Sequence, residues 1–278
     1  MKIIIPKVAA FVISLAFVGL LFTGAAHSQG LMSKAVAIWL FDEDGGKKVK
    51  DFARNNHDGE FEGKPEWVPG KFGTALKFIG ADELAWVDIE RPVVVDTVDF
   101  SIGCWLLPGS PQHWHQNVLS GRDAAESDKG IALAQFENAV NSYRIVIGGV
   151  FNWQGLGNPR NTARLAQDEW SHLVFVREGR GGTWYKNGEP DRPKRGNFFI
   201  DVGSVKPVNP PIENFRIGAA SFNDELRYRG VIDEVFIFER ALSQDEVQRI
   251  MNDGFEEAQK VDAKGKAATM WGTIKSSE

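Results

Sequence analysis

The sequence predicts an all-β fold, a sandwich or barrel of many short strands, followed by one short helix. Aromatic and β-branched residues concentrate in short runs, and Gly, Pro, Asn and Asp separate these runs. Such spacing is typical of sheets joined by tight turns. Glycine supplies 29 of 278 residues, above the usual share of about 7%, which also favours turns and bulges. The clearest runs are 35–41, 84–89, 100–107, 143–147, 171–177, 183–186, 214–218 and 230–238.

The first 28 residues have the layout of a secretory signal peptide. Two lysines precede an apolar run over 8–22, and Ala26 and Ser28 supply small residues at positions −3 and −1 of a cleavage site. The alternative is a membrane anchor, but a spanning helix needs about 20 apolar residues and this run is shorter. We expect cleavage, no later membrane span, and a secreted, periplasmic or cell-surface location.

Composition restricts the class of protein. Hydrophobic residues make up 43% and charged residues 25%, as in ordinary globular proteins. Loss of Lys2 and Lys7 with the signal moves the formal net charge from −5 to −7. A mildly acidic chain without a basic block does not favour a nucleic-acid partner. Cys104 is the only cysteine, so no internal disulfide forms, and its strand-like surroundings predict a small buried side chain.

One hairpin is well signalled. The run 170–177 alternates as a strand, 178–182 forms the turn, and 183–186 returns. Asn187-Gly188 predicts a second tight turn, because both residues tolerate positive φ.

The predicted helix begins after Ser243. Ser243 and Glu246 form a capping box, in which each side chain satisfies a free backbone N–H. Apolar residues at 247, 250 and 251 form one stripe, and Gly254 suits a left-handed cap. The charged tail over 254–278 is compatible with a strap, an extended segment or disorder.

Several segments, in order, resemble laminin-G-like jelly-roll domains. The first are AIWLFDEDGG at 37–46, VKD at 49–51, NNHDG at 55–59 and PEWVPGKFGTALKF at 65–78. The middle contains FSIGCW at 100–105, WSHLV at 170–174 and WYKNG at 184–188, and the end contains GVIDEVFIFERALS at 230–243. The resemblance implies a concanavalin A-like jelly-roll sandwich of two antiparallel sheets over residues 35–253. The loops over 109–130 and 151–168 depart from the pattern, so ligand specificity does not carry over.

The resemblance also implies a structural calcium ion near the sandwich edge, since hard cations bind several carboxylate and carbonyl oxygens. Asp233 is the informative residue, because an unpartnered carboxylate among apolar neighbours is costly. The alternative is that Asp233 accepts backbone N–H bonds or pairs with Arg240, and that the other residues only form turns. The predicted ligands are Asp42, Asp51, Asn55, Asp58 and Asp233.

A glycan-binding site would combine exposed aromatic rings with planar polar groups. We expect Trp114, Trp153 and Tyr228 as aromatic platforms, with Asn152 and Arg160 beside them. The alternative is that these tryptophans fill space at loop bases. Three further tryptophans are expected in the core: Trp39, Trp105 and Trp170.

Catalytic and zinc motifs are weak. Laminarinase-type relatives carry E-x-D-x-x-E on one strand, and neither Glu126-Ser127-Asp128 nor Glu189-Pro190-Asp191 completes it. His113-Trp114-His115 offers an H-x-H pair, either a zinc ligand pair or two solvated loop histidines.

The resulting hypothesis is an exported, non-catalytic, lectin-like module that binds a carbohydrate or glycoconjugate. Two alternatives stay open: an adhesion module that binds an extracellular protein, and a glycoside hydrolase of the same fold. The sequence does not indicate an oligomeric state.

Overall fold

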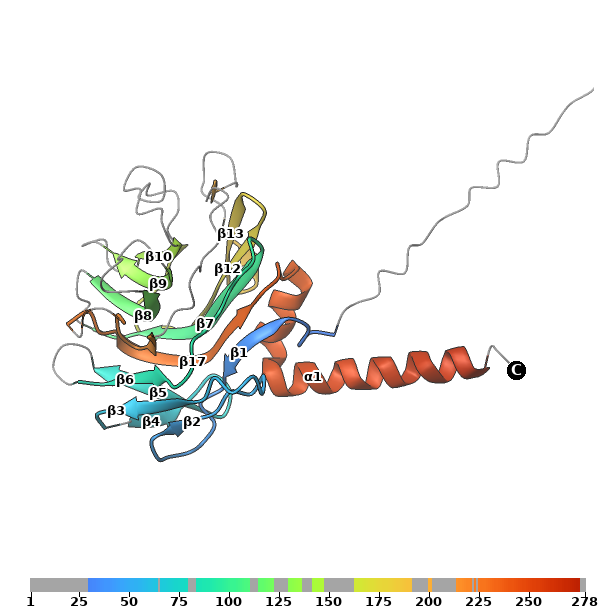
Figure 1. The fold of residues 1–278 in the computed structure, drawn as a ribbon, viewed down its shortest axis with the longest axis horizontal. Coiled ribbons are helices and arrows are strands. Elements are labelled where there is room, and N and C mark those ends of the chain that lie inside the picture. Colours follow the sequence, from blue (N-terminus) through green and yellow to red (C-terminus); the bar gives the residue numbers. More distant parts are fainter. Residues whose placement is uncertain are drawn as a thin grey trace, which may run out of the picture.

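The computed structural model of the chain describes residues 30–64, 66–79, 84–110, 115–122, 130–136, 142–147, 163–191, 200–201, 214–221, 223 and 225–275. Its strands form two antiparallel sheets, and a long helix lies at the C-terminal end (Figure 1). The predicted all-β sandwich of two antiparallel sheets is confirmed.

The nine-stranded sheet runs β14-β13-β12-β7-β17-β5-β4, with β1 beside β17 and β15 beside β13. Its strands are β1 (Ala35–Trp39), β4 (Glu66–Pro69), β5 (Thr74–Ile79), β7 (Phe100–Pro108), β12 (Ser171–Glu178), β13 (Gly181–Lys186), β14 (Glu189–Pro190), β15 (Ile200–Asp201) and β17 (Arg229–Phe238).

The eight-stranded sheet runs β11-β10-β9-β8-β16-β6-β3-β2. Its strands are β2 (Lys48–Val49), β3 (Gly59–Glu62), β6 (Trp86–Ile89), β8 (His115–Arg122), β9 (Gly130–Phe136), β10 (Ser142–Ile147), β11 (Ala163–Arg164) and β16 (Phe215–Ile217).

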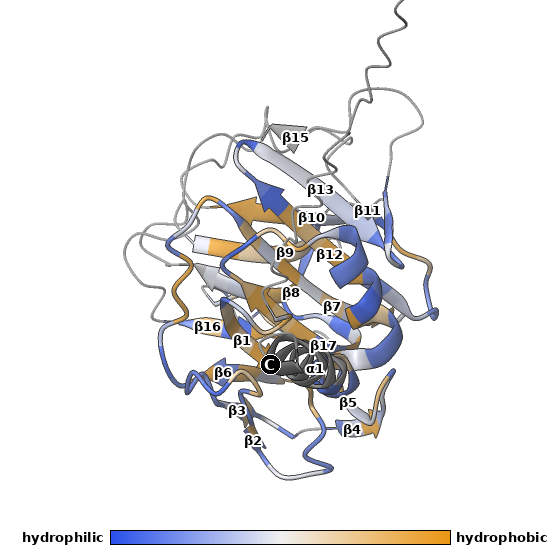
Figure 2. Cartoon of the chain, turned by 90° about the vertical axis from the view of Figure 1, so that its right-hand side faces the viewer, coloured by the Kyte–Doolittle hydropathy of each residue, from blue (hydrophilic) through white to orange (hydrophobic). Residues whose placement is uncertain are grey.

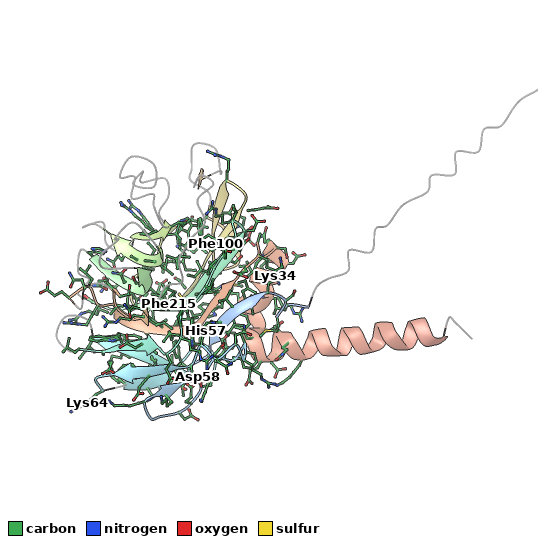
Figure 3. The ribbon with its side chains drawn as sticks, viewed as in Figure 1. Lys34, His57, Asp58, Lys64, Phe100 and Phe215 are labelled. Atoms are coloured by element: carbon green, nitrogen blue, oxygen red, sulfur yellow. The ribbon has the colours of Figure 1, made fainter. Side chains whose placement is uncertain are left out.

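A single apolar core fills the space between the sheets. Trp39 of β1 stacks on Phe215 of β16 with ring centroids 5.9 Å apart, and Phe61 of β3 stacks on Phe78 of β5 at 5.8 Å. Each of these pairs joins one sheet to the other, and Figure 3 labels Phe215 inside the body of the domain. The prediction that Trp39 belongs to the core is therefore confirmed.

The longest strand, β17, organises the nine-stranded sheet. On one side it pairs with β7, and on the other with β5 over 229–232 and then with β1 over 235–238. The register with β7 shifts between Asp233 and Phe236, and Glu234 lies there at φ 51°. This combination is a β-bulge, and it places two acidic residues at the junction of β5 and β1.

The predicted hairpin is present as β12 and β13: β12 lies one residue later than expected, β13 begins two residues earlier, and the turn is at Gly179-Arg180. Asn187 and Gly188 adopt φ 50° and 78°, which confirms the second turn. Cys104 is buried on the core side of β7, where desolvation raises the pKa of its thiol well above the usual range.

Helix α1 (Gln244–Lys275) begins at the predicted capping box, in which the N–H of Ser243 donates to Glu246 and the N–H of Glu246 donates to the Ser243 hydroxyl. Gly254 interrupts it at φ 68°, ψ 171°. The backbone then resumes helical geometry to Lys275. Over its described residues the tail is therefore helical and not extended.

The first half of α1 covers the side of the nine-stranded sheet that faces away from the core. Val247, Ile250 and Phe255 pack with Val174 and Phe236 in a second apolar cluster. Figure 2 shows the helix in front of the hydrophobic strands β7, β12 and β17. The corresponding outer side of the eight-stranded sheet has no such apolar cluster over its described residues. No helix in the described part of the chain is long and apolar enough to span a membrane.

Candidate functional site

The residues predicted to bind calcium separate into two groups. The first group, Asp51, Asn55 and Asp58, lies in the segment between β2 and β3. Asn55 Nδ2 donates to the carbonyls of Ala35 (2.8 Å) and Val36 (2.9 Å), which ties this segment to β1. Figure 3 labels Asp58 beside His57 below β1.

The Asp51 carboxylate is saturated with backbone donors. Its Oδ1 accepts from the N–H groups of Ile38 (3.1 Å) and Ala53 (3.0 Å), and its Oδ2 accepts from Asn55 (2.8 Å) and His57 (3.3 Å). A carboxylate with four such bonds has little capacity left for a metal ion. The arrangement matches the alternative that this segment is turn chemistry.

Asp58 plays a related part. Its Oδ1 accepts the N–H of Asp51 at 2.9 Å, and its Oδ2 pairs with Lys50 at 2.5 Å. Desolvation is the largest single influence on the pKa of Asp58 and raises it, but the hydrogen bonds from Asp51 and Lys50 and the nearby lysine charges together outweigh it, so the pKa lies below its ordinary value.

The second group, Asp42 and Asp233, lies around the loop that joins β4 to β5. Asp233 is fully buried, and its Oδ2 accepts the N–H groups of Lys71 (2.7 Å) and Phe72 (3.2 Å). Asp42 Oδ1 accepts the N–H of Thr74 at 2.8 Å. Asp233 therefore bonds backbone N–H groups, while Arg240 pairs instead with Glu246 at 2.7 Å.

Two glycines let this loop approach the carboxylates. A Cβ at Gly73 would lie 1.9 Å from Asp42 Oδ1, and a Cβ at Gly70 would lie 2.7 Å from Asp233 Oδ2. Both distances are shorter than a Cβ atom tolerates, so positions 70 and 73 of the loop require glycine. The loop and the two carboxylates form one packed unit.

Burial dominates the electrostatics of this unit. Desolvation raises the pKa of Asp233 to about 7, with the charge of Asp42 adding to the effect and the backbone hydrogen bonds opposing it. Desolvation and then the charge of Asp233 raise the pKa of the neighbouring Glu234 to about 8. Glu234 accepts the N–H of Phe255 at 3.2 Å, directly after the break in α1.

The fit of this unit to a hard cation is partial. Asp233 Oδ1 is buried without a hydrogen-bond partner in the described structure, which is the kind of oxygen a cation would satisfy. However, no three His, Cys, Asp or Glu side chains of the described residues gather as a metal cluster. A calcium ion here would need backbone carbonyls and water for most of its six to eight oxygens.

A different polar site lies on the outer side of the eight-stranded sheet, which we call the polar face. Core residues alternate along its strands with residues that point the other way. Cross-strand register places these outward residues in two rows. One row is Asp88, Arg216, Ser120 and Ala132, and the other is Asn117, Ala134 and Arg144.

Arg216 of β16 is the centre of the best-defined contacts on the polar face. Its Nε donates to Asp88 Oδ1 at 2.8 Å, and its guanidinium carbon lies 4.5 Å from the centroid of the Trp86 ring. Trp86 Nε1 donates to the other oxygen of Asp88 at 2.8 Å. The Arg216 side chain is 18% exposed and that of Asp88 is 44% exposed. A planar cation and a carboxylate thus reach solvent, while the buried ring of Trp86 holds them from below.

The centre of the polar face is lined by small and amide side chains. Ser120 is buried and its hydroxyl lies 3.2 Å from that of Ser221. Asn117 is 1% exposed, and its Nδ2 has no acceptor among the described residues. Arg227 bridges to Asn117 from a neighbouring segment, so its side chain joins the same face.

None of the residues predicted to bind glycan is among the described residues of the polar face. Trp114, Trp153, Asn152 and Arg160 lie outside the described residues. Tyr228 does not form the expected exposed platform: it is fully buried, and its hydroxyl lies 3.3 Å from that of Tyr143 in the core. The N–H of Tyr228 donates to the carbonyl of Gly218, and the ring lies in the core. The adjacent Arg227 bridges to Asn117, so its side chain lies on the other side of the segment.

Two other expectations are corrected. His115 is not a solvated loop residue but lies in β8 with 9% of its surface exposed, and His113 lies outside the described residues. Trp105 is buried as expected, with 5% of its surface exposed, but it lies on the outer side of the nine-stranded sheet, because its neighbours Cys104 and Leu106 occupy the core side of β7. Trp170 is only half-buried and meets Trp105 edge-on.

A buried imidazole lies next to Trp105. His172 of β12 has both ring nitrogens buried without partners among the described residues, and its ring centroid is 5.1 Å from that of Trp105. Desolvation lowers the pKa of His172 to about 3. The side chain is therefore neutral, and it packs as an aromatic ring between Trp105 and Phe236.

With this geometry established, the chain can be compared with known proteins. The model of one family, described as the concanavalin A-like lectin/glucanases superfamily, matches residues 82–248. This chain belongs to that superfamily. Among curated proteins, none matches the chain.

Solved structures share the fold of this superfamily member at low identity. Domain 4 of an extracellular GH43 arabinanase from Geobacillus stearothermophilus, solved with arabinotriose, has a TM-score of 0.59 and 17% identity, and the match covers 79% of this chain and 98% of that domain. The sialidase of Trypanosoma rangeli, solved with sialic acid, has a TM-score of 0.54 and 18% identity over 78% of this chain. This chain spans only 32% of the sialidase chain.

Proposed function

We propose that this member of the superfamily is an exported, non-catalytic carbohydrate-binding module whose polar face contacts the saccharide. The Trp86–Asp88–Arg216 group carries the proposal. It places a partly exposed guanidinium and a carboxylate at the surface of the sheet, and the buried Trp86 ring beneath them holds both in position. Planar charged groups held in this way can hydrogen-bond the hydroxyl groups of a saccharide. Its members are held by one another, so little side-chain entropy is lost on binding.

The relatives support a carbohydrate ligand. Domain 4 of the arabinanase is matched over nearly its whole length, and it was solved in complex with arabinotriose. The sialidase was solved with sialic acid, and this chain matches about a third of its length. A module of this size that accompanies a carbohydrate-active enzyme domain can bind the saccharide without having catalytic residues of its own.

A structural calcium ion at Asp42 and Asp233 is part of the proposal. The support is the orphaned Asp233 Oδ1 and the proximity of both carboxylates to the Gly70–Gly73 loop. The ion would neutralise two carboxylates and join the loop to β17. It would contribute to stability rather than to saccharide contact, because Asp233 lies on the nine-stranded sheet and the polar face on the other.

The test is binding of the mature protein to a broad saccharide array, followed by titration calorimetry with the best ligands. Trp86→Phe removes the indole N–H bond to Asp88, and we expect it to weaken binding several-fold. Trp67→Phe is the matched control, because Trp67 Nε1 also donates one hydrogen bond, to Gly46 at 3.2 Å, but lies on β4 of the other sheet. An array with no binding by the folded protein would overturn the proposal and favour a protein-binding module.

Catalysis is tested in parallel. The folded protein is incubated with the saccharides that it binds, and reducing ends are measured over a day. We expect no release of sugar above a protein-free blank. Turnover that is lost in Asp88→Asn would instead identify a glycoside hydrolase.

A further inference from the structure

We propose that the polar face selects saccharides that carry negative charge, as carboxylate or sulfate groups. This inference rests on the proposed function, because it names the ligand class of the same face.

The charges on the eight-stranded sheet are unevenly distributed. Strands β8, β9, β10, β11 and β16 contain no Asp or Glu at all. Register places Arg144 and Arg216 on the polar face, and Arg164 pairs with position 142, which shares the orientation of Arg144. Arg227 joins through its bridge to Asn117. These four arginines lie on one face of a chain whose formal net charge is −5. Arg164 is exposed, Arg216 and Arg227 are partly exposed, and Arg144 is buried within the face.

Among the described strands of this sheet, the acidic side chains of the face lie toward its other end. Asp88 on β6 is the nearest, and it already bridges Arg216. Beyond it, Glu60 of β3 pairs with Lys48 at 3.1 Å, at the far edge of the sheet. The anionic groups of a bound saccharide would therefore lie over β16, β8 and β10, and neutral rings over β6 and β3.

The hydrogen-bonding groups point to the same ligand chemistry. The arginine side chains are donors only, and the buried Nδ2 of Asn117 is a donor that has no acceptor in the described structure. Among the described residues of β8, β10 and β16 on this face, charged groups are cationic only, which favours a ligand with anionic acceptor oxygens. Carboxylate and sulfate groups provide these oxygens in the planar or forked geometry that guanidinium groups bind.

Arg216 is oriented in advance for this role. Its guanidinium lies over the Trp86 ring, its Nε is bound to Asp88, and its Nη1 donates to the carbonyl of Ala220 at 3.3 Å. A held guanidinium loses less freedom when it binds an anion than a free one does. Arg216 is therefore the residue whose change best reports on anion recognition.

The experiment is titration calorimetry of the mature protein with three probes of similar length: oligogalacturonate, a sulfated heparin-type oligosaccharide and neutral arabino-oligosaccharide. We expect one of the anionic probes to bind at least about tenfold more tightly than the neutral one. The comparison of carboxylated with sulfated probe identifies which anion is preferred. Raising NaCl from about 50 to about 500 mM should weaken the anionic probe and leave the neutral one nearly unchanged.

Variants locate the effect. Arg216→Gln should reduce affinity for the anionic probe about tenfold, and Arg216→Lys, which keeps the charge but not the fork, should have an intermediate effect. Arg180→Gln is the matched control, because Arg180 is exposed in the β12–β13 turn of the other sheet. Thermal melting of each variant verifies that it is folded.

Three results would overturn the inference. Equal affinity for neutral and anionic probes, or salt-independent binding, would show that charge is not selected, while the proposed carbohydrate function would stand. Equal losses in Arg216→Gln and Arg180→Gln would place the anion site elsewhere. Binding to none of the three probes would count against the carbohydrate function itself.

Discussion

The carboxylate of Asp233 and the backbone N–H of Lys71 meet at 2.7 Å across 162 residues of sequence. The bond joins the bulge of β17 to the loop between β4 and β5. At this position β17 changes its partner from β5 to β1, and the side-chain bond takes the place of the backbone hydrogen bonds that join strands elsewhere. A buried acidic residue is therefore part of the junction that holds three segments of the nine-stranded sheet together.

Removing Asp233 should destabilise the protein and abolish its response to chelator. Asp233→Ala loses two buried hydrogen bonds and leaves two N–H groups without an acceptor, which costs about 2–4 kcal/mol. If calcium binds at this site, EDTA should lower the melting temperature of the parent protein by several degrees and leave Asp233→Ala unchanged. Asp253→Ala, at an exposed position of α1, is the control. Identical parent melting curves in EDTA and in excess Ca²⁺ would contradict the calcium proposal.

Glu234 should make the folded state less stable as pH rises. Its folded pKa of about 8 lies above the ordinary value of 4.5 because of burial and the nearby charge of Asp233. A carboxyl group with a raised pKa contributes its full stability below about pH 4.5 and loses it as pH rises through 8. Glu234→Gln cannot ionise, so in EDTA its melting temperature should exceed that of the parent at pH 8 and approach it at pH 4. A difference between the two proteins that does not change with pH would rule out this ionisation.

His172 should make the folded state less stable as pH falls, which is the opposite of the effect of Glu234. Burial lowers its folded pKa to about 3, below the ordinary 6.5. A neutral buried imidazole contributes stability above pH 6.5, and this stability falls as pH drops from 6.5 toward 3, because the unfolded chain gains a proton first. The parent should therefore lose stability relative to His172→Gln between pH 6.5 and 4. Urea unfolding of both proteins at pH 7.5, 5.5 and 4.5 measures the difference, and parallel curves would refute the assignment.

Gly188 should be intolerant of a side chain for two separable reasons. It adopts φ 78°, and a Cβ there would lie 2.9 Å from Gln248 Cγ and 3.2 Å from Met251 Cε on α1. Gly188→Ala should cost about 2 kcal/mol or more, from backbone strain and from displacement of the helix. Gly179→Ala is the matched control: φ is 57°, but nothing lies within 4 Å, so only the backbone cost of about 1 kcal/mol remains. Equal losses in urea unfolding would exclude the helix contact.

Local signals in the sequence were enough to predict much of the fold. Ser243 and Glu246 make the capping-box contacts that their spacing implies, and Asn187-Gly188 turns as its composition implies. Such features depend on neighbouring residues only. Gly254 shows the limit: its positive φ was predictable, but the helix that follows it was not, since a glycine cap does not determine what comes next.

The candidate site depended on register, which sequence alone did not supply. Arg216 and Asp88 are 128 residues apart, and only the pairing of β16 with β6 makes them neighbours. Tyr228 and Trp105 were misplaced for the same reason, because the direction of an aromatic side chain depends on which face of the sheet is covered. For Trp105, Lys71 of the β4–β5 loop and the rings of Trp170 and His172 cover the side chain outside the sandwich. A polar residue alternating with core residues, such as Arg144 in β10, was the available signal for the polar face.

The attachment of β1 and α1 to the same sheet has a mechanical consequence. Strand β1 pairs with β17, and the first half of α1 packs over that same sheet. In Figure 1 both leave the body on the side opposite β8, β9 and β10. A force applied through either segment would therefore act first on the nine-stranded sheet, and reach the eight-stranded sheet only through the apolar core between them.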